Sequence, residues 1–240
     1  SGTYFLNDTR DREADAQHPT KCRRPIAAGV VPPALGYVMG FGLILAGVAV
    51  GFIPHWQLAV TVGAYVALTT SYSFWLKHIP VVDIVAIAAG FVLRAIGGAT
   101  ATGVPISNWF FIVASFGSLF IVAGKRSGEM GELAGAAGSI RPTLEVYTTS
   151  YLAYLRAVSS GVMLVAYCLW SFEKADLATA GGFPYYQLSI VPFAVAILRY
   201  AMLLDLGQGS TPEDIALHDR PFQIAIALWL VIFGCGIYLL

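Results

Sequence analysis

Long apolar stretches recur along the chain and are separated by short polar segments. A helix that crosses a membrane needs about 20 mostly apolar residues. Seven stretches have this length, at 32–53, 56–76, 80–101, 107–124, 150–172, 186–204 and 221–240. They are too long and too uniformly apolar for a transmembrane barrel, and backbone groups in lipid must be hydrogen-bonded within the element. The pattern therefore predicts an all-α fold, a polytopic helical bundle in the membrane.

Composition supports a membrane protein. The chain is 57% hydrophobic and only 12% charged, with a mean hydropathy of +0.71, whereas soluble domains are roughly 25% charged. Its net charge of zero gives no indication of a nucleic-acid partner. At the start, the apolar residues Tyr4 to Leu6 run directly into a polar segment, as the tail of an eighth span would. We expect a single membrane domain over residues 1–240 that is incomplete at its N-terminus.

Basic residues are distributed unequally between the two sides of the predicted bundle. Alternate threading of the spans places the segments 7–31, 77–79, 125–149 and 205–220 on one side. The basic residues of these segments include Arg10, Arg12, Lys21, Arg23, Arg24, Lys77, Lys125, Arg126, Arg141 and Arg220, whereas the opposite loops contain only Lys174. By the positive-inside rule, the basic side faces the cytoplasm, in a cell (plasma) membrane.

An acidic segment lies on this cytoplasmic side. If the segment is helical, Asp8, Asp11 and Asp15 follow at steps of three and four and share a face, with Asn7 one turn from Asp11. Carboxylates this close repel one another, and a hard cation such as Mg²⁺, shared with substrate phosphates, would relieve the repulsion. The alternative is a solvated helix end with the neighbouring arginines as counter-charges.

Charges near the ends of two spans admit two interpretations. Lys77 ends one span, and Asp83 lies in the first turn of the next. Lys125 and Arg126 are expected to open a glycine-rich loop directly after the span 107–124. These cations either bind substrate or have a structural role. In the structural interpretation, Lys77 snorkels to the membrane surface, and Lys125 and Arg126 form a positive-inside anchor.

Three arginines fall within predicted spans: Arg94, Arg156 and Arg199. A charge at mid-span costs a few kcal/mol or more and normally faces a partner or an aqueous cavity. Asp83 is on roughly the same helix face as Arg94, but a separation of about 16 Å along the axis excludes a direct pair. The roles of the three arginines stay open between ligand binding and helix contacts.

The acidic segment also resembles a family motif. Asn7-Asp8-x-x-Asp11-x-x-x-Asp15, followed by His18-Pro19-x-Lys21-x-x-Arg24-Pro25, resembles the first aspartate-rich motif of the UbiA superfamily of intramembrane prenyltransferases. The resemblance covers essentially the whole chain. It implies a nine-span fold, here with seven full spans and the tail of an eighth.

The second family motif is replaced. Typical members have a second aspartate-rich motif in the loop after the sixth helix, but here the segment reads Lys125-Arg126-Ser127-Gly128-Glu129-Met130-Gly131-Glu132. Lysine and arginine bind phosphate oxygens directly. This segment resembles the decaprenyl-phosphate phosphoribosyltransferase branch of actinobacteria. Two other stretches contribute to the resemblance: Tyr72-Ser73-x-x-Leu76-Lys77, and Leu198-Arg199-Tyr200 before Pro212-Glu213-Asp214-Ile215-Ala216-Leu217.

This resemblance implies an enzyme, a pentosyltransferase. It would move 5-phosphoribose from 5-phosphoribosyl 1-diphosphate to decaprenyl (polyprenyl) phosphate and release diphosphate, in the synthesis of arabinan (arabinogalactan) precursors for the cell wall. The catalytic and metal-binding residues would be Asp8, Asp11 and Asp15, with Mg²⁺ or Mn²⁺. The substrate-binding residues would be Asn7, Lys21, Arg24, Tyr72, Lys77, Lys125, Arg126 and Arg141.

Two other functions remain as alternatives, and a homo-oligomer is compatible with the sequence. One is a conventional prenyltransferase that moves a prenyl group from its diphosphate to an aromatic acceptor, although no second aspartate cluster supports it. The other is an ion-coupled transporter with Asp83 and Arg94 as its charge relay. It would predict internal repeats, and the sequence has no convincing repeat.

Overall fold

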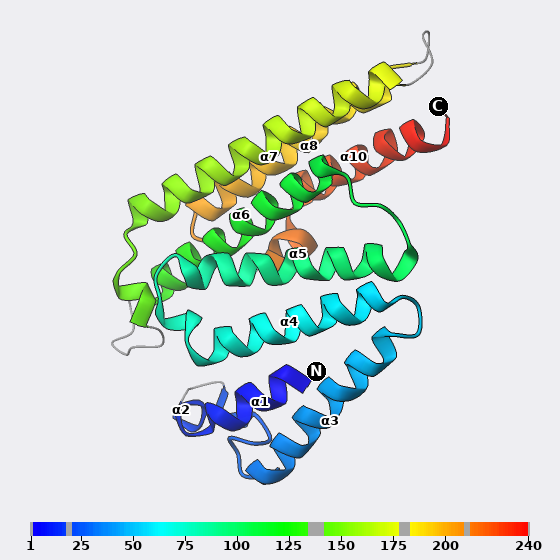
Figure 1. Cartoon of the computed structure of the whole chain (residues 1–240). Coiled ribbons are helices and arrows are strands. Elements are labelled where there is room, and N and C mark those ends of the chain that lie inside the picture. The colour runs from blue at the N-terminus through cyan, green and yellow to red at the C-terminus, as the bar shows by residue number, and fades with distance from the viewer. Residues whose placement is uncertain (1, 18–20, 134–141, 178–182, 209–211, 240) are drawn as a thin grey trace. The chain divides into compact units, whose positions relative to one another are not determined.

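The computed structural model describes residues 2–17, 21–133, 142–177, 183–208 and 212–239. Every regular element in these ranges is a helix (Figure 1). The chain divides into two compact units, Ser1–Ile106 and Ser107–Leu240. The all-α fold predicted from the sequence is therefore confirmed.

The first unit contains the acidic segment and three long helices. Its elements are α1 (Gly2–Arg10), α2 (Arg12–Ala16), η1 (Lys21–Arg23), α3 (Pro33–Gly51), α4 (Trp56–Phe74), η2 (Leu76–His78) and α5 (Val82–Thr102). Helix α4 packs between α3 and α5, and α1 packs against α3 and α4 (Figure 1). This packing places the C-terminal end of α1, where the carboxylates begin, beside the turn between α4 and α5.

The second unit is a helical bundle with an aromatic core. Its elements are α6 (Asn108–Leu133), η3 (Pro142–Glu145), α7 (Thr149–Leu177), α8 (Tyr185–Asp205), α9 (Pro212–His218) and α10 (Arg220–Tyr238). Helix α7 packs against α6 and α8, and α8 packs against α10. The buried core contains Phe120, Met163, Tyr167, Phe193, Tyr200, Leu203, Leu204 and Ile215.

Each of the seven predicted apolar stretches corresponds to one long helix. Within the described residues, six of these helices are long and apolar enough to cross a membrane. Helix α4 has the same length as α3, but it includes polar residues such as Gln57, Thr61 and Thr69 and is not among the six. Many large apolar side chains of α3 and α10 are exposed, as expected for helix faces that contact lipid.

Glycines allow α1 to approach α3 closely. Gly36 and Gly40, four residues apart in α3, lie against α1. A Cβ atom at Gly36 would overlap the Oγ1 of Thr9, and one at Gly40 would come within 2.7 Å of the Cδ2 of Leu6. Small residues at this spacing are typical of close helix contacts in membranes. Because Thr9 directly follows Asp8, this contact also fixes the position of the first carboxylate.

Candidate active site

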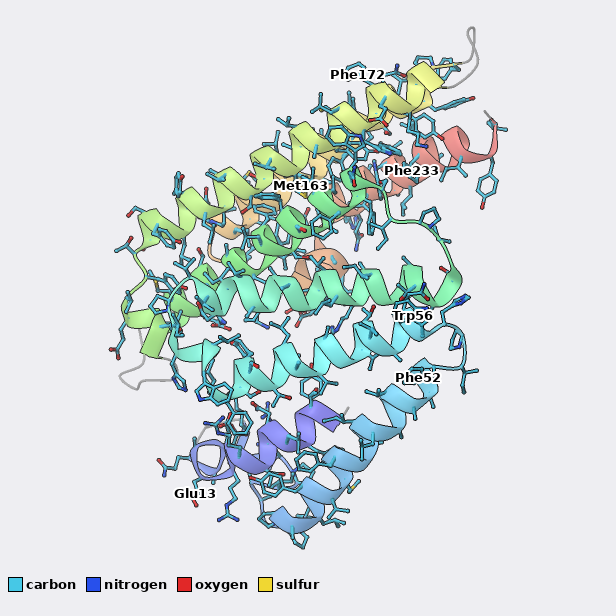
Figure 2. The ribbon with its side chains drawn as sticks, viewed as in Figure 1. Glu13, Phe52, Trp56, Met163, Phe172 and Phe233 are labelled. Carbon is cyan, nitrogen blue, oxygen red and sulfur yellow. The ribbon has the colours of Figure 1, made fainter. Side chains whose placement is uncertain are left out.

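The acidic segment bends in its middle. Helix α1 ends at Arg10, Asp11 is in a bend, and α2 begins at Arg12. The backbone N–H of Asp11 still donates to Asn7 O at 2.9 Å, and that of Asp15 donates to Asp11 O at 2.8 Å. The segment therefore keeps the helical hydrogen bonds between residues four apart, as predicted, although the helix is interrupted at Asp11. Glu13 points away from the helices, as predicted, and is exposed (Figure 2).

Arg24 joins two of the three carboxylates. Its Nη1 atom donates to Asp8 Oδ1 at 2.7 Å and to Asp15 Oδ2 at 2.9 Å. Asp15 is buried, with 5% of its surface exposed, and the Nζ of Lys21 lies 4.0 Å from its Oδ1 atom. A single nitrogen thus occupies the position between two carboxylates that have converged.

The third carboxylate contacts a different cation. The Nζ of Lys77, in η2, lies 3.2 Å from Asp11 Oδ2. Beside this pair, Arg10 donates to Ser73 O at 2.8 Å, and its guanidinium lies 4.0 Å from the centre of the Phe74 ring. A cation at the C-terminal end of a helix is favourable because the helix dipole is negative there. Arg10, which the sequence did not suggest as a site residue, therefore helps to fix α1 beside the end of α4.

The surroundings of Asp8 disfavour the charged form of its carboxyl. Burial raises the pKa of its carboxyl above the ordinary value of 3.8, and the charges of Asp15 and Asp11 act in the same direction. The charge of Arg24 and a hydrogen bond from Asn7 lower the pKa, but they do not reverse the shift. An additional cation near Asp8 would therefore be stabilised by the ionised carboxylate.

The turn after Lys77 contains a strained residue. Val81 has a φ of 69° and a ψ of −47°, and it is the only non-glycine residue with positive φ among those described. Such a conformation is costly for a β-branched residue and is retained only where the surroundings impose it. Val81 directly precedes α5, so its conformation helps to fix the first turn of this helix close to the Lys77–Asp11 pair.

The residue types of this cluster suit a divalent cation. Carboxylate oxygens are the ligands that Mg²⁺ prefers, and the Nη1 of Arg24 shows that a positive group fits between Asp8 and Asp15. Within the described residues, no group of three His, Cys, Asp or Glu side chains is arranged to bind a metal. The metal role of Asp8, Asp11 and Asp15 therefore stays a prediction, which requires their paired cations to move aside.

The predicted loop beginning at Lys125 was wrong, because α6 continues to Leu133. Both cations lie within this helix. Lys125 is exposed, whereas Arg126 is 2% exposed and donates to Glu129 Oε2 at 2.6 Å. This pair of residues three apart supports the helix. Gly124 allows α6 to pack closely on α8, since a Cβ atom there would lie 2.6 Å from a side-chain carbon of Leu204 in α8. Arg141 lies outside the described residues.

Two of the arginines within predicted spans form ion pairs in the second unit. Arg156 donates to Asp205 Oδ1 at 2.6 Å, and Arg199 contacts both carboxylate oxygens of Asp219 at 2.7 and 3.1 Å. Each pair joins residues on different helices or helix ends. Their contacts support a structural role, which the sequence alone had left open.

Arg94 and Tyr72, both in the first unit, line a common cavity with Tyr4 and Tyr65. The Nη2 of Arg94 donates to the hydroxyl of Tyr65 at 2.7 Å, so Asp83 is not its partner. The sequence did not single out Tyr4 or Tyr65. Tyr65 is seven residues before Tyr72 in α4 and therefore lies on the same helix face, which is the signal that could have indicated it.

Comparison with known proteins agrees with this arrangement of membrane helices and an acidic segment. Residues 1–230 match the model of the UbiA prenyltransferase family. The chain therefore belongs to this family.

Relatives within the comparison cover almost the whole chain. A decaprenyl-phosphate phosphoribosyltransferase of Corynebacterium glutamicum is 42% identical over 100% of this chain and 73% of the relative. Proteins of the same name from Mycolicibacterium smegmatis and Mycobacterium tuberculosis are 43% and 40% identical, over 99% of this chain and 76% and 77% of the relatives. The chain is thus similar to these enzymes in both of its units.

Proposed function

We propose that the protein is a membrane pentosyltransferase that moves 5-phosphoribose from 5-phosphoribosyl 1-diphosphate to decaprenyl or a similar polyprenyl phosphate. The observation that carries this proposal is the similarity, over essentially the whole chain, to relatives named for that activity. The alternation of carboxylates and cations in the first unit supports it, because a substrate with several phosphates requires both metal ligands and phosphate-binding groups.

The three aspartates would bind Mg²⁺, or Mn²⁺, together with the diphosphate of the donor. When bound, the metal supplies Lewis acidity that neutralises charge on the leaving diphosphate. Arg24 and Lys77 now contact Asp8, Asp15 and Asp11, and would turn to phosphate oxygens once these carboxylates have another partner. Lys21, close to Asp15, would act in the same way.

Positioning would supply most of the acceleration. A phosphate oxygen of the lipid attacks C1 of the ribose from the face opposite the diphosphate. The new C1–O bond forms as the bond to the diphosphate breaks, and the configuration at C1 inverts. The lipid phosphate is already ionised at neutral pH, so the reaction needs correct alignment more than a strong base.

Lys125 and Arg126 of α6 would also serve as phosphate-binding residues. Lys125 is exposed on α6 and can contact a phosphate directly. Arg126 forms an ion pair with Glu129, and this pair would fix the position of its guanidinium for phosphate binding. The protein would lie in the plasma membrane with its basic segments facing the cytoplasm, and phosphorylated donors are available in the cytoplasm. The product would serve the synthesis of cell-wall arabinan.

The proposal is tested with purified protein in detergent. The protein is incubated with Mg²⁺, labelled 5-phosphoribosyl 1-diphosphate and decaprenyl phosphate, and the lipid fraction is examined for label. We expect labelled lipid and released diphosphate in equal amounts. An absence of labelled lipid, combined with turnover of a prenyl diphosphate in the presence of a phenol, would identify a conventional prenyltransferase instead.

A further inference from the structure

Arg94 lies deep within α5. It is about 18 Å from the start of the helix and about 12 Å from its end. Helix α5 is one of the six helices able to cross a membrane. A guanidinium at this depth is costly unless a counter-charge or water is present. Among the described residues of the first unit, no carboxylate lies within ion-pair distance of Arg94.

The partners of Arg94 are neutral aromatic residues. Its Nη2 donates to Tyr65 at 2.7 Å, and its guanidinium carbon lies 5.3 and 5.7 Å from the ring centres of Tyr65 and Phe91. Tyr4 also interacts with the guanidinium. These contacts orient the cation without neutralising its charge. The contact with Tyr65 uses one of its five N–H groups.

The guanidinium faces a cavity of about 200 Å³ within the first unit. The cavity is several times larger than the ~30 Å³ that one water occupies in the liquid. Its polar lining consists of Arg94, Thr69 and the hydroxyls of Tyr4, Tyr65 and Tyr72, and none of its ten lining residues is acidic. Because Tyr65 accepts the hydrogen bond from Arg94, its own hydroxyl hydrogen can be donated to a ligand.

We propose that this cavity, lined by Arg94 and the tyrosines of α1 and α4, binds a phosphate group. A ligand that brings negative charge and several acceptor oxygens completes the hydrogen bonding of the cavity and neutralises the guanidinium. Phosphate has both properties, and arginine is the side chain that matches its geometry best. Tyr72 belongs to a family motif, whereas Arg94, Tyr4 and Tyr65 belong neither to the family motifs nor to the acidic cluster.

The cavity adjoins the acidic cluster along two helices. Tyr4 is one helical turn before Asp8 in α1, and Tyr72 is five residues before Lys77. Tyr65 and Tyr72 are about 10 Å apart along α4, so a ligand can extend from the carboxylates towards Arg94. Two phosphates fit this position: the 5-phosphate of the donor and the head group of the polyprenyl phosphate. This choice of sources rests on the proposed function, whereas phosphate binding itself does not.

The test measures binding and thermal unfolding of the purified chain in detergent with EDTA, so that no metal occupies the acidic cluster. The probes are ribose 5-phosphate and farnesyl phosphate, with ribose and farnesol as uncharged controls. The variants are Arg94→Gln, Arg94→Lys and Tyr65→Phe. Arg220→Gln is the matched control, because Arg220 is exposed at the start of α10.

We expect Arg94→Gln to weaken binding of one phosphate probe by roughly 10- to 100-fold, the loss typical of removing a charged hydrogen-bond partner. Arg94→Lys should retain part of the affinity, and Arg220→Gln should bind as the wild type does. A loss confined to ribose 5-phosphate assigns the cavity to the donor, and a loss confined to farnesyl phosphate assigns it to the lipid. The same probe should raise the melting temperature of the wild type and not that of Arg94→Gln.

Unchanged affinity of Arg94→Gln for both phosphates would overturn the proposal, as would a wild type that binds neither. If Arg94→Gln does not fold, Tyr65→Phe decides, since loss of the hydroxyl that orients Arg94 should still weaken binding severalfold. Transfer of labelled phosphoribose by the wild type with Mg²⁺ is measured separately. The proposed function therefore stands or fails independently of the cavity.

Discussion

The Nζ of Lys77 lies 3.2 Å from Oδ2 of Asp11, although 66 positions separate the two residues. The pair joins the bend between α1 and α2 to the turn between α4 and α5. Both side chains are about three-quarters buried, at 25% and 26% exposure. Because this largely buried contact joins two remote segments, it fixes the carboxylate of Asp11 relative to α4 and α5.

Replacement of Lys77 should impair activity more than stability. Lys77→Met removes the partner of Asp11, and we expect transfer of phosphoribose to fall by about 100-fold, as for other lost groups that bind developing charge. The pair contributes only about 1 kcal/mol or less to folding, because it is still in contact with solvent. Initial rates and melting temperatures in detergent measure the two effects.

Lys174→Met is the matched control for Lys77, since Lys174 is an exposed lysine near the end of α7. It should leave both the rate and the melting temperature unchanged. Equal rates for the two variants would contradict a role of Lys77 in the site.

Asp11→Asn keeps the shape of the side chain but removes its charge. We expect a loss of activity of about 100-fold or more and a higher Mg²⁺ concentration for half-maximal rate, because a carboxylate binds this ion better than an amide does. Titration of the rate with Mg²⁺ is the measurement. Glu13→Gln provides the control, since Glu13 is exposed and pairs with Arg12. A Mg²⁺ dependence of Asp11→Asn equal to that of the control would exclude Asp11 as a metal ligand.

Gly36→Ala should disturb the active site from a distance. The added methyl group overlaps Thr9 Oγ1, which already donates to Phe5 O at 2.6 Å, so Thr9 cannot turn away without losing that bond. We expect destabilisation by about 1–3 kcal/mol, typical of overpacking, and a lower rate because Asp8 moves with Thr9. Thermal unfolding and initial rates together measure this effect.

Gly42→Ala tests the same substitution in the same helix without the contact. No atom lies within 4 Å of the position that its Cβ would take. It should stabilise α3 by about 0.5–1 kcal/mol, the usual gain from glycine to alanine in a helix. A similar response of the two variants would show that the approach of α1 to α3 is not tight.

Val81→Gly should be tolerated, unlike most replacements of valine by glycine. Glycine adopts a positive φ without strain, and the strain relieved, about 1–3 kcal/mol, offsets the greater entropy of the unfolded chain. We expect an equal or higher melting temperature. Val82→Gly, at the first residue of α5, has no strain to relieve and should lower stability by about 1 kcal/mol. A lower melting temperature for Val81→Gly than for Val82→Gly would contradict this account.

Asp219 should make stability depend on pH in the acidic range. The hydrogen bonds from Arg199, and that from the backbone N–H of Phe222, lower the pKa of its carboxyl below the ordinary value of 3.8. The folded state therefore favours the ionised form more than the unfolded state does. The resulting stabilisation is complete above pH 3.8 and is lost as the pH falls through the lower, folded pKa. Asp219→Asn should remove this dependence, which acid unfolding at several pH values can measure.

Much of the first unit could be predicted from the sequence, because its signals are local. Apolar length predicted the helices, and the steps of three and four between Asp8, Asp11 and Asp15 predicted a common region for their side chains. Lys21, Arg24 and Lys77 were also expected in the site, but as ligands of phosphate. Their contacts with the carboxylates depend on tertiary packing, which sequence spacing does not encode.

Two features depended on neighbours that the sequence could not reveal. The close approach of α6 to α8 at Gly124 depends on the side chain of Leu204, which is 80 positions away and fills the space beside the glycine. The partner of Arg94 is an aromatic hydroxyl on another helix rather than a carboxylate. The sequence excluded Asp83 as a direct partner but offered no other, whereas the structure shows that Tyr65 orients the guanidinium.

The contacts of Arg24, Lys21 and Lys77 with the three aspartates make the acidic cluster electrically balanced before any substrate arrives. Under the proposed function, a metal ion alone would leave an excess of positive charge there, and a diphosphate alone would leave an excess of negative charge. Each should therefore increase the affinity for the other, and by equal factors, because such coupling is thermodynamically reciprocal. The site would accept the metal and the donor as a pair, and the order in which they arrive would not change the final complex.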